Sequence, residues 1–418
     1  MRFKFVHAAD LHLDTPFRGV PVDSGLLSTF QQATFRAFSR VVDLCLRERV
    51  DFLVLAGDLF DTKDRSVRAR LVLRRELERL AAGGIQTFLV HGNHDPLSGD
   101  TGTLALPGAV KVFGAEWEEV EVRREGRLLC RVQGISYPEA EVRENLSARF
   151  RRTAPDFTVG LLHANVGGSE GHANYAPCSV EDLTARGLDY WALGHVHTRT
   201  EYPLASGAVA VYPGNPQGRH VHEPGERGCV LVEVEDGRTR RRFVPVDRVR
   251  WHRWELPLTG LGTLETLVGA VEERVDAECS AALEGHAVRL TLTGQGPLHR
   301  ELSAPESLRQ LEAELREQLA ARPTPVLLES LRDASRSELD LETVRRAGGF
   351  SGTLLSEAEA VMADADELTA LWDGDEELRT LAHRLRRLDM PTLMTPRPEW
   401  VEQAGWRVVR ELHEEDAA

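Results

Sequence analysis

Asp51-Phe-Leu-Val-Leu-Ala-Gly-Asp-Leu-Phe-Asp61 joins a short apolar run to a turn that carries two acids. Residues 51–56 have the length and composition of a buried β-strand, and Gly57 lets the backbone turn sharply after it. Ligands collect at the carboxyl ends of strands in an open α/β sheet. Asp58 and Asp61 are therefore predicted to lie at a functional sheet edge.

Four further blocks follow apolar runs in the same way: Asp10-Leu-His12, Gly92-Asn93-His94-Asp95, His163 and Gly194-His195-Val-His197. These blocks offer oxygen and nitrogen donors and no sulfur. Such a set favours two divalent ions that hydrolyse a phosphate ester, because a structural zinc site would use cysteine. Asp10-Leu-His12 alone is a weak signal, the block that ends at Asp61 is a modest one, and the blocks at 92–95 and 194–197 are stronger. Together in this order, each after a strand, they are very hard to explain by chance.

Residues two apart in an extended chain point to the same side, so Asp10 and His12 can reach one ion, and His195 and His197 can serve neighbouring ions. Asp58 is the candidate bridge, because a carboxylate has two oxygens. The predicted metal ligands are Asp10, His12, Asp58, Asn93, His163, His195 and His197. Two divalent ions would leave this centre positive and would attract a phosphodiester.

His94 is left over as a predicted catalytic residue that does not bind metal. It could stabilise the developing charge or protonate the leaving group. Asp61 is expected to orient His94 as a carboxylate fixes an imidazole tautomer. Asp95 is expected to be a structural acid of its loop, and His7 a histidine of the core.

The order of elements predicts an α/β fold. Strands and helices alternate over residues 1–135, and short strands are expected at 119–123, 128–135, 157–162, 189–193, 207–212, 228–235 and 239–246. Two sheets face to face with helices outside are the expected result for a first domain, 1–249. A βαβαβ pattern then predicts an α/β cap at 250–334, and an acidic, mainly helical region follows at 335–418.

Acidic and basic residues balance in residues 1–250, so the net charge of −15 comes from the rest of the chain. A basic footprint for nucleic acid is absent at whole-chain level. The five cysteines form no CxxC pair, which indicates reduced thiols and a cytoplasmic protein. Neither a signal peptide nor a membrane span is expected.

Two segments leave alternatives open. The loop 214–222 is either an ordinary surface turn or a substrate-facing loop in which Arg219 and Asn215 contact DNA. In the tail, an apolar stripe either covers its own domain or docks a partner helix. The stripe consists of Leu354, Ala358, Val361, Ala365, Leu368 and Trp372.

The blocks DLHLD, GDLFD, HGNHD and GHVH, with YPGNPQGRH after them, resemble the calcineurin-like metallophosphoesterase superfamily and its SbcD/YhaO-like double-strand-break repair exonucleases. The resemblance implies a four-layer αββα sandwich with two manganese ions. One ion would be held by Asp10, His12, Asp58 and His197, and the other by Asp58, Asn93, His163 and His195. His94 would lie at the leaving-group side.

The resemblance further implies an exonuclease that hydrolyses DNA phosphodiester bonds in DNA repair, together with an SMC-like coiled-coil ATPase of the SbcC/YhaN type. The C-terminal helices would grip this partner, and Trp372, Trp400 and Trp406 are either anchors or core residues. A homodimer is a further expectation. The alternatives are a phosphoesterase for small molecules or phosphoproteins, and a non-catalytic sensor of DNA ends.

Overall fold

The structure is a computed structural model. It describes residues 1–13, 15, 27–61, 66–99, 105–168, 174–336, 346, 348–364 and the positions 366, 369, 370, 374–376, 401, 404 and 408. The chain forms two compact units. The first holds residues 1–256, 268–291 and 305–332, and the second holds 257–267, 292–304 and 333–418.

Two six-stranded sheets build most of the first unit. The first sheet has the order β12 (Arg238–Pro245), β11 (Gly228–Glu235), β1 (Arg2–Ala8), β2 (Phe52–Ala56), β3 (Gln86–Val90), β4 (Val110–Val112). The second has the order β5 (Glu118–Arg124), β6 (Arg127–Ile135), β7 (Thr158–His163), β8 (Tyr190–Gly194), β10 (Val209–Tyr212), β9 (Thr200–Pro203).

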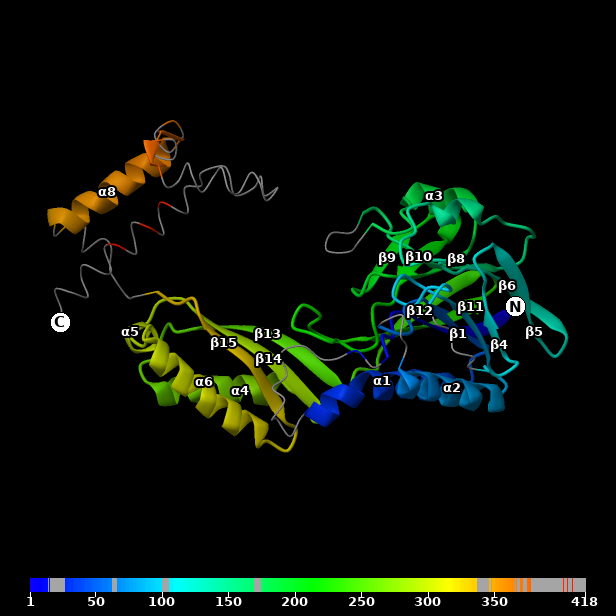
Figure 1. The fold of residues 1–418 in the computed structure, drawn as a ribbon, viewed down its shortest axis with the longest axis horizontal. Helices are drawn as coiled ribbons and strands as arrows, with labels where there is room; N and C mark the ends of the chain where they lie inside the picture. The colour runs from blue at the N-terminus through cyan, green and yellow to red at the C-terminus, as the bar shows by residue number, and fades with distance from the viewer. Residues whose placement is uncertain are drawn as a thin grey trace. The chain divides into compact units, whose positions relative to one another are not determined.

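Three apolar layers hold these sheets between helices. One core lies between the first sheet and the helices α1 (Leu27–Glu48) and α2 (Val67–Ala82). A second core joins the inner faces of the two sheets, where the rings of Phe5 and Phe52 stack with centroids 4.8 Å apart. The third core covers the outer face of the second sheet with α3 (Val180–Arg186) (Figure 1). The predicted αββα sandwich is confirmed.

Strand direction explains why the polar blocks meet. β1, β2 and β3 run parallel and pair directly, so the residues after Ala8, Ala56 and Val90 leave the sheet at one edge. β7 and β8 are also parallel, with His163 opposite Gly194 at their ends. The two sheets therefore present all five blocks at the same end of the sandwich.

The predicted cap elements are present in order: β13 (Val249–Pro257), α4 (Leu264–Glu278), β14 (Gly285–Thr293), α6 (Pro305–Ala320) and β15 (Val326–Asp333). The three strands form one sheet in the order β13-β14-β15. In the first unit, Val249 and Trp251 of β13 pack with Phe30 of α1 in a small apolar cluster.

Several short elements were not predicted: β4, β9, the 3₁₀ turns η1 (Leu146–Arg149) and η2 (Ala205–Gly207), and α5 (His299–Leu302). Three or four residues are too few to show a hydrophobic period. Pairing with a neighbouring strand therefore determines that β4 and β9 form strands.

In the tail, α8 (Gly349–Ala363) carries Leu354, Ala358 and Val361. Ala365, Leu368, Trp372, Trp400 and Trp406 lie outside the described residues. Among the helices that the structure describes, none combines the length and apolar character that a bilayer crossing requires.

His7 is a core residue, as predicted. Its side chain is fully buried on β1, where Nδ1 lies 3.0 Å from the Tyr190 hydroxyl and Nε2 lies 3.2 Å from the Leu193 carbonyl. A carbonyl only accepts, so Nε2 donates to it and Nδ1 accepts from Tyr190. Burial lowers the pKa of His7 from 6.5 to about 3.

This burial predicts an acid sensitivity. Below pH 6.5 the unfolded chain binds a proton at His7 and the folded chain does not, so the free energy of unfolding falls as pH drops toward 3. His7→Gln should reduce this slope by up to about 1.4 kcal/mol per pH unit. Urea unfolding of metal-free protein across this range measures it, with exposed His222→Gln as the control. If the free energy of unfolding fell equally steeply with pH in wild type and in His7→Gln, His7 would not be the source of the acid sensitivity.

Candidate metal centre

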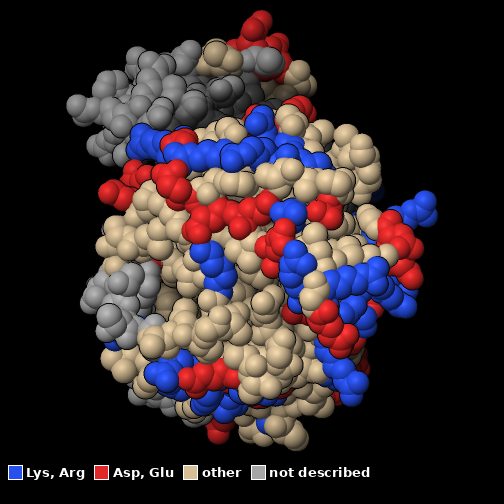
Figure 2. All heavy atoms as spheres, turned by 90° about the vertical axis from the view of Figure 1, so that its right-hand side faces the viewer, with Lys and Arg blue, Asp and Glu red and all other residues tan. Residues whose placement is uncertain are grey.

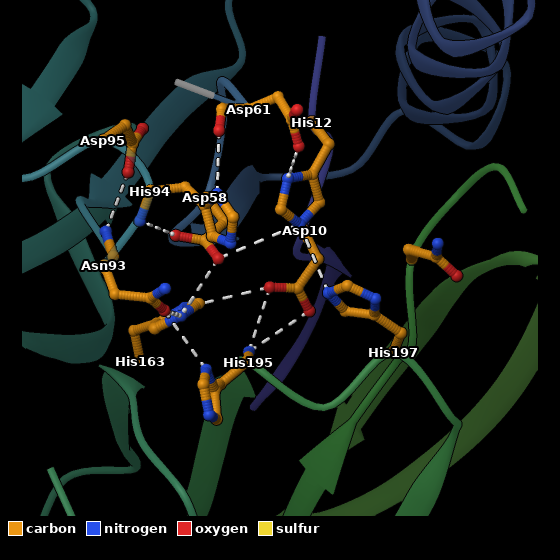
Figure 3. Close-up of polar contacts among 12 residues, drawn as sticks. Asp10, His12, Asp58, Asp61, Asn93, His94, Asp95, His163, His195 and His197 are labelled. Atoms are coloured by element: carbon orange, nitrogen blue, oxygen red, sulfur yellow. Dashed lines mark hydrogen bonds and ion pairs between the residues drawn. The ribbon is translucent and has the colours of Figure 1, made fainter. Parts of the chain in front are cut away.

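The side chains that follow the five strands converge at one end of the sandwich (Figure 3). Three groups of side chains there could each hold an ion, because the donor atoms within each group lie within 4.8 Å of one another. The groups are Asp10, His12 and His197; Asp10, Asp58 and His163; and His12, Asp58 and His94. Asp10, His12, Asp58 and His163 are buried, whereas His94 is exposed. The centre is therefore closed on one side and open on the side of His94.

The backbone at this centre is strained. Asp10, His12, Asp58 and His195 all adopt positive φ angles, of 52°, 42°, 48° and 103°. Residues with a side chain avoid this region, and such strain gathers at functional sites. At Gly92 a Cβ would collide with the Asp58 carboxylate and the His163 ring, so only glycine lets the chain pass here.

One half of the centre joins the ends of β1 and β8. His12 Nε2 lies 3.2 Å from His197 Nε2 and 3.8 Å from Asp58 Oδ2. The Asp10 carboxylate accepts from the backbone N–H of His195 at 3.0 Å through Oδ1. This bond fixes the carboxylate between the two strands.

The other half joins the ends of β2, β3 and β7. His163 Nε2 lies 3.4 Å from Asp58 Oδ2 and 3.1 Å from Asn93 Oδ1. His195 Nδ1 lies 3.2 Å from the same Asn93 oxygen. Asp58 contacts residues of both halves, in the place of the predicted bridge, and the seven predicted ligands form one continuous set.

The outward ring nitrogens test whether these residues suit cations. His163 Nδ1 lies 2.9 Å from the Ala56 carbonyl, His197 Nδ1 lies 2.7 Å from Glu223 Oε1, and His12 Nδ1 lies 3.2 Å from Asp61 Oδ1. The Ala56 carbonyl and the Glu223 carboxylate only accept, so Nδ1 of His163 and Nδ1 of His197 donate to them and leave Nε2 as the ligand atom of the neutral ring. His12 Nδ1 lies beside the Asp61 carboxylate at ion-pair distance. Metal-binding histidines are held in this way. The residues fit divalent cations.

Electrostatics at the centre agree with this fit. Burial raises the pKa of the Asp58 carboxyl, yet the adjacent His163 outweighs burial and holds it well below its usual range. Burial lowers the pKa of His163, but the Asp58 and Asp10 carboxylates raise it to about 9. Two buried carboxylates thus share one cationic partner, His163, within the metal-free protein, and its extra proton would leave when an ion binds.

Asp61 meets His94 differently from the prediction. His94 Nδ1 lies 2.7 Å from the backbone carbonyl of Asp61, whereas the Asp61 carboxylate pairs with His12 and with Arg219. The expected contact through the Asp61 carboxylate is wrong. The sequence suggested a contact between two side chains, but in the structure a backbone carbonyl orients the His94 ring.

Asp95 is a structural acid, as predicted. Its side chain is fully buried, with Oδ2 accepting from the Leu59 N–H at 3.0 Å and Oδ1 from the Gly92 N–H at 2.9 Å. These bonds tie the loop after β3 to the loop after β2. Asp58 and Asn93 lie in the two loops that are joined.

Arg219 and Asn215, the predicted DNA contacts, are buried residues. Arg219 pairs with Asp61 at 3.1 Å and with Glu223 at 3.1 Å. The Asn215 amide donates to Glu223 Oε2 at 2.9 Å, and its oxygen accepts from Arg227. A grip on DNA phosphate would require these partners to be exchanged, so that contact stays a prediction.

Glu223 was missed in the sequence. It is 4% exposed, and His197 and Arg219 both contact it. Burial raises the pKa of its carboxyl, but the hydrogen bond from His197 and the charge of Arg219 hold it well below its usual range. The signal was an acid directly after a loop rich in histidine and arginine. Such a signal is weak, because loop acids are usually solvated.

Glu223→Gln should weaken Mn²⁺ binding about 10- to 100-fold, because the amide holds the His197 imidazole less firmly. Titration calorimetry of metal-stripped protein measures the dissociation constant. Glu226→Gln, an exposed acid three residues away, is the matched control and should bind like wild type. Equal affinities in all three proteins would show that Glu223 does not support the centre.

Charges on one face of the molecule are mixed. Figure 2 shows basic and acidic side chains side by side over this face. Among the described residues, several bases pair directly with acids, for example Arg131 with Glu119 and Glu121, and Lys111 with Glu118.

Comparisons with known proteins agree with this geometry. Residues 3–199 match the calcineurin-like phosphoesterase family, and residues 251–336 match the middle domain of metallophosphoesterase YhaO. The uncharacterized metallophosphoesterase YhaO of Bacillus subtilis (strain 168) is 39% identical over 298 residues, covering 70% of this chain and 72% of YhaO.

More distant proteins match over a smaller part. The DNA double-strand break repair protein Mre11 of Sulfurisphaera tokodaii is 28% identical over 195 residues, 44% of this chain and 48% of Mre11. A solved dimetal phosphatase from Danio rerio aligns with a TM-score of 0.37 at 13% identity, over 58% of this chain and 96% of that chain. The match over residues 3–199 and the identity to YhaO show that the chain belongs to the calcineurin-like metallophosphoesterases, in their SbcD/YhaO-like branch.

Proposed function

We propose that the chain is a DNA exonuclease that hydrolyses phosphodiester bonds with two divalent metal ions, most readily Mn²⁺, in DNA repair. The observation that carries the proposal is the arrangement of His12, His163 and His197. Their outer nitrogens face acceptor oxygens, and their inner nitrogens converge on two buried carboxylates.

One ion would be held by Asp10, His12, Asp58 and His197, and the other by Asp58, Asn93, His163 and His195. A bound pair of ions activates water and neutralises phosphoryl oxygens. The protein residues orient this chemistry. His94, exposed at the open side, has Nε2 available for the substrate because Nδ1 is taken by the Asp61 carbonyl.

DNA as the substrate is supported by the relatives and by the size of the chain. Mre11 is named as a DNA double-strand break repair protein. The residues after 250 add most of a third sheet and the helix α8, which phosphate-ester hydrolysis alone does not need. We propose that an SMC-like ATPase of the SbcC/YhaN type binds residues 335–418, that 1–249 and 250–334 are separate domains, and that the protein acts in the cytoplasm as a homodimer.

The test is incubation with end-labelled duplex, hairpin and single-stranded DNA in Mn²⁺, beside a bis-nitrophenyl phosphodiester. The proposal expects nucleotides to be released from DNA ends, with activity lost in chelator and restored by Mn²⁺. Arg219→Lys tests whether Arg219 contacts DNA phosphate or only positions its neighbours at the centre. A loss of DNA affinity with normal metal affinity supports the phosphate contact.

Cleavage of the nitrophenyl diester without cleavage of any DNA would instead support a phosphoesterase for small molecules or phosphoproteins. The net charge of −15 favours this second candidate, because DNA-binding domains are usually basic. Hydrolysis that survives chelation would refute the metal mechanism for both candidates.

A further inference from the structure

A second cluster of metal-type side chains lies in the first compact unit, away from the five blocks. β13, the residue after α4, and β14 bring together His252, Cys279 and His286, whose donor atoms all lie within 4.8 Å of one another. His286 is fully buried, and His252 and Cys279 are partly buried. None of these residues contributes to the centre described above.

Two hydrogen bonds order the rings of this cluster. His252 Nε2 lies 2.9 Å from His286 Nδ1, and His286 Nε2 lies 3.1 Å from the Ser280 carbonyl. At the other end His252 Nδ1 faces Glu278 Oε2 at 4.0 Å. The Ser280 carbonyl only accepts, so His286 Nε2 donates to it and His286 Nδ1 accepts from His252 Nε2. At 4.0 Å the Glu278 carboxylate is too far from His252 Nδ1 for a hydrogen bond.

A third proton on the rings is disfavoured. Burial lowers the pKa of His252 to about 4, with further lowering by the neighbouring His286, and burial also lowers the pKa of His286. Arg250 and Arg274 lie near these rings and oppose another positive charge. Both rings are therefore neutral in the metal-free protein, and neutral imidazole is the form that binds a metal ion.

We propose that His252 Nε2, His286 Nδ1 and Cys279 Sγ form a binding site for a zinc-type cation. A cation between the two rings would replace the hydrogen bond between them, and each ring would then carry its N–H on the outer nitrogen. His286 would donate to the Ser280 carbonyl, and His252 would donate toward Glu278. Outer acceptors hold the rings at the first centre in the same way.

Glu278 is well placed to face the outer N–H of His252. Its Oε2 accepts from Trp254 Nε1 at 2.7 Å, and its Oε1 pairs with Arg274 at 2.9 Å. The carboxylate is thereby fixed beside the His252 ring.

The donor set decides the kind of ion. One sulfur and two imidazole nitrogens favour zinc over manganese, which prefers oxygen. The Cys279 thiol gives up its proton to solvent when the ion binds. Among the five cysteines, Cys279 is the one that is not fully buried, so an ion can reach it. The bound ion would tie β13, β14 and the end of α4 together and would leave a fourth position for water.

Cobalt(II) tests the proposal on the full chain. A thiolate bound to cobalt absorbs in the near ultraviolet, and the first centre cannot give this signal because it contains no sulfur. Metal-stripped wild type should develop the absorption, and zinc should abolish it. The Asp58→Ala variant should retain it, because that change affects the first centre alone.

Two variants and one control complete the test. Cys279→Ser should lose the absorption, while Cys178→Ser, which removes a thiol elsewhere, should keep it. His252→Gln should weaken cobalt binding at least about tenfold, and it keeps the test informative if Cys279→Ser does not fold. Absence of the absorption in folded wild type, or an undiminished signal in Cys279→Ser, would overturn the site.

Discussion

Asp58→Ala is expected to lower phosphodiester hydrolysis at least about a thousandfold, which corresponds to about 4 kcal/mol of transition-state stabilisation. Asp58 is the acid that contacts both halves of the centre. Its Oδ2 lies 3.4 Å from His163 Nε2 and 3.8 Å from His12 Nε2. Without this carboxylate both proposed ions lose a ligand, and about half of the buried negative charge that would hold them is gone.

The same substitution also disturbs the protein directly. Asp58 Oδ1 accepts from the His94 backbone N–H at 3.0 Å, so the loop after β3 loses an anchor. Atomic absorption should therefore find little bound Mn²⁺, and hydrolysis of the nitrophenyl diester should stay near background even in excess metal.

The matched control is Asp51→Ala at the opposite end of β2. Asp51 accepts from the Lys4 N–H at 3.0 Å and pairs with Arg124 at 3.0 Å, so its loss also removes buried contacts. It should cost stability without affecting metal content. Retained activity in Asp58→Ala, with Mn²⁺ bound at the wild-type level, would refute the bridging role.

The sequence predicted the ends of β1, β2, β3, β7 and β8 correctly because each is a buried apolar run closed by polar residues. Parallel pairing then brings those ends together by topology alone. Spacing of two along an extended chain assigned Asp10 and His12 to one side, although both residues adopt positive φ angles. The predicted convergence thus depends more on strand order than on ideal strand geometry.

The residues that hold the metal-type side chains could not be found in this way. Ala56 and Asp61 act through backbone carbonyls, and every residue has one. Glu223 reaches His197 from a loop without regular secondary structure, and only the folded chain shows that it is buried. The second cluster was missed for a related reason, because His252, Cys279 and His286 have no motif spacing.

His94→Ala is expected to keep both metal affinity and fold while the turnover rate falls about 100- to 1,000-fold, as for the loss of a general acid or a charge-stabilising group. The His94 side chain is exposed, so its removal leaves no buried cavity. The backbone N–H of residue 94 still donates to Asp58 Oδ1, so the ligand stays oriented. The expected change lies in kcat rather than in KM.

The choice of substrate separates the two roles proposed for His94. A nitrophenolate leaves without help, whereas the sugar oxygen of DNA needs a proton. If His94 protonates the leaving oxygen, the alanine variant should lose far more activity on DNA than on the nitrophenyl diester. A similar loss on both would mean that the imidazole stabilises charge on the phosphoryl group. Exposed His222→Ala serves as the control, and full activity of His94→Ala on both substrates would remove His94 from the catalytic set.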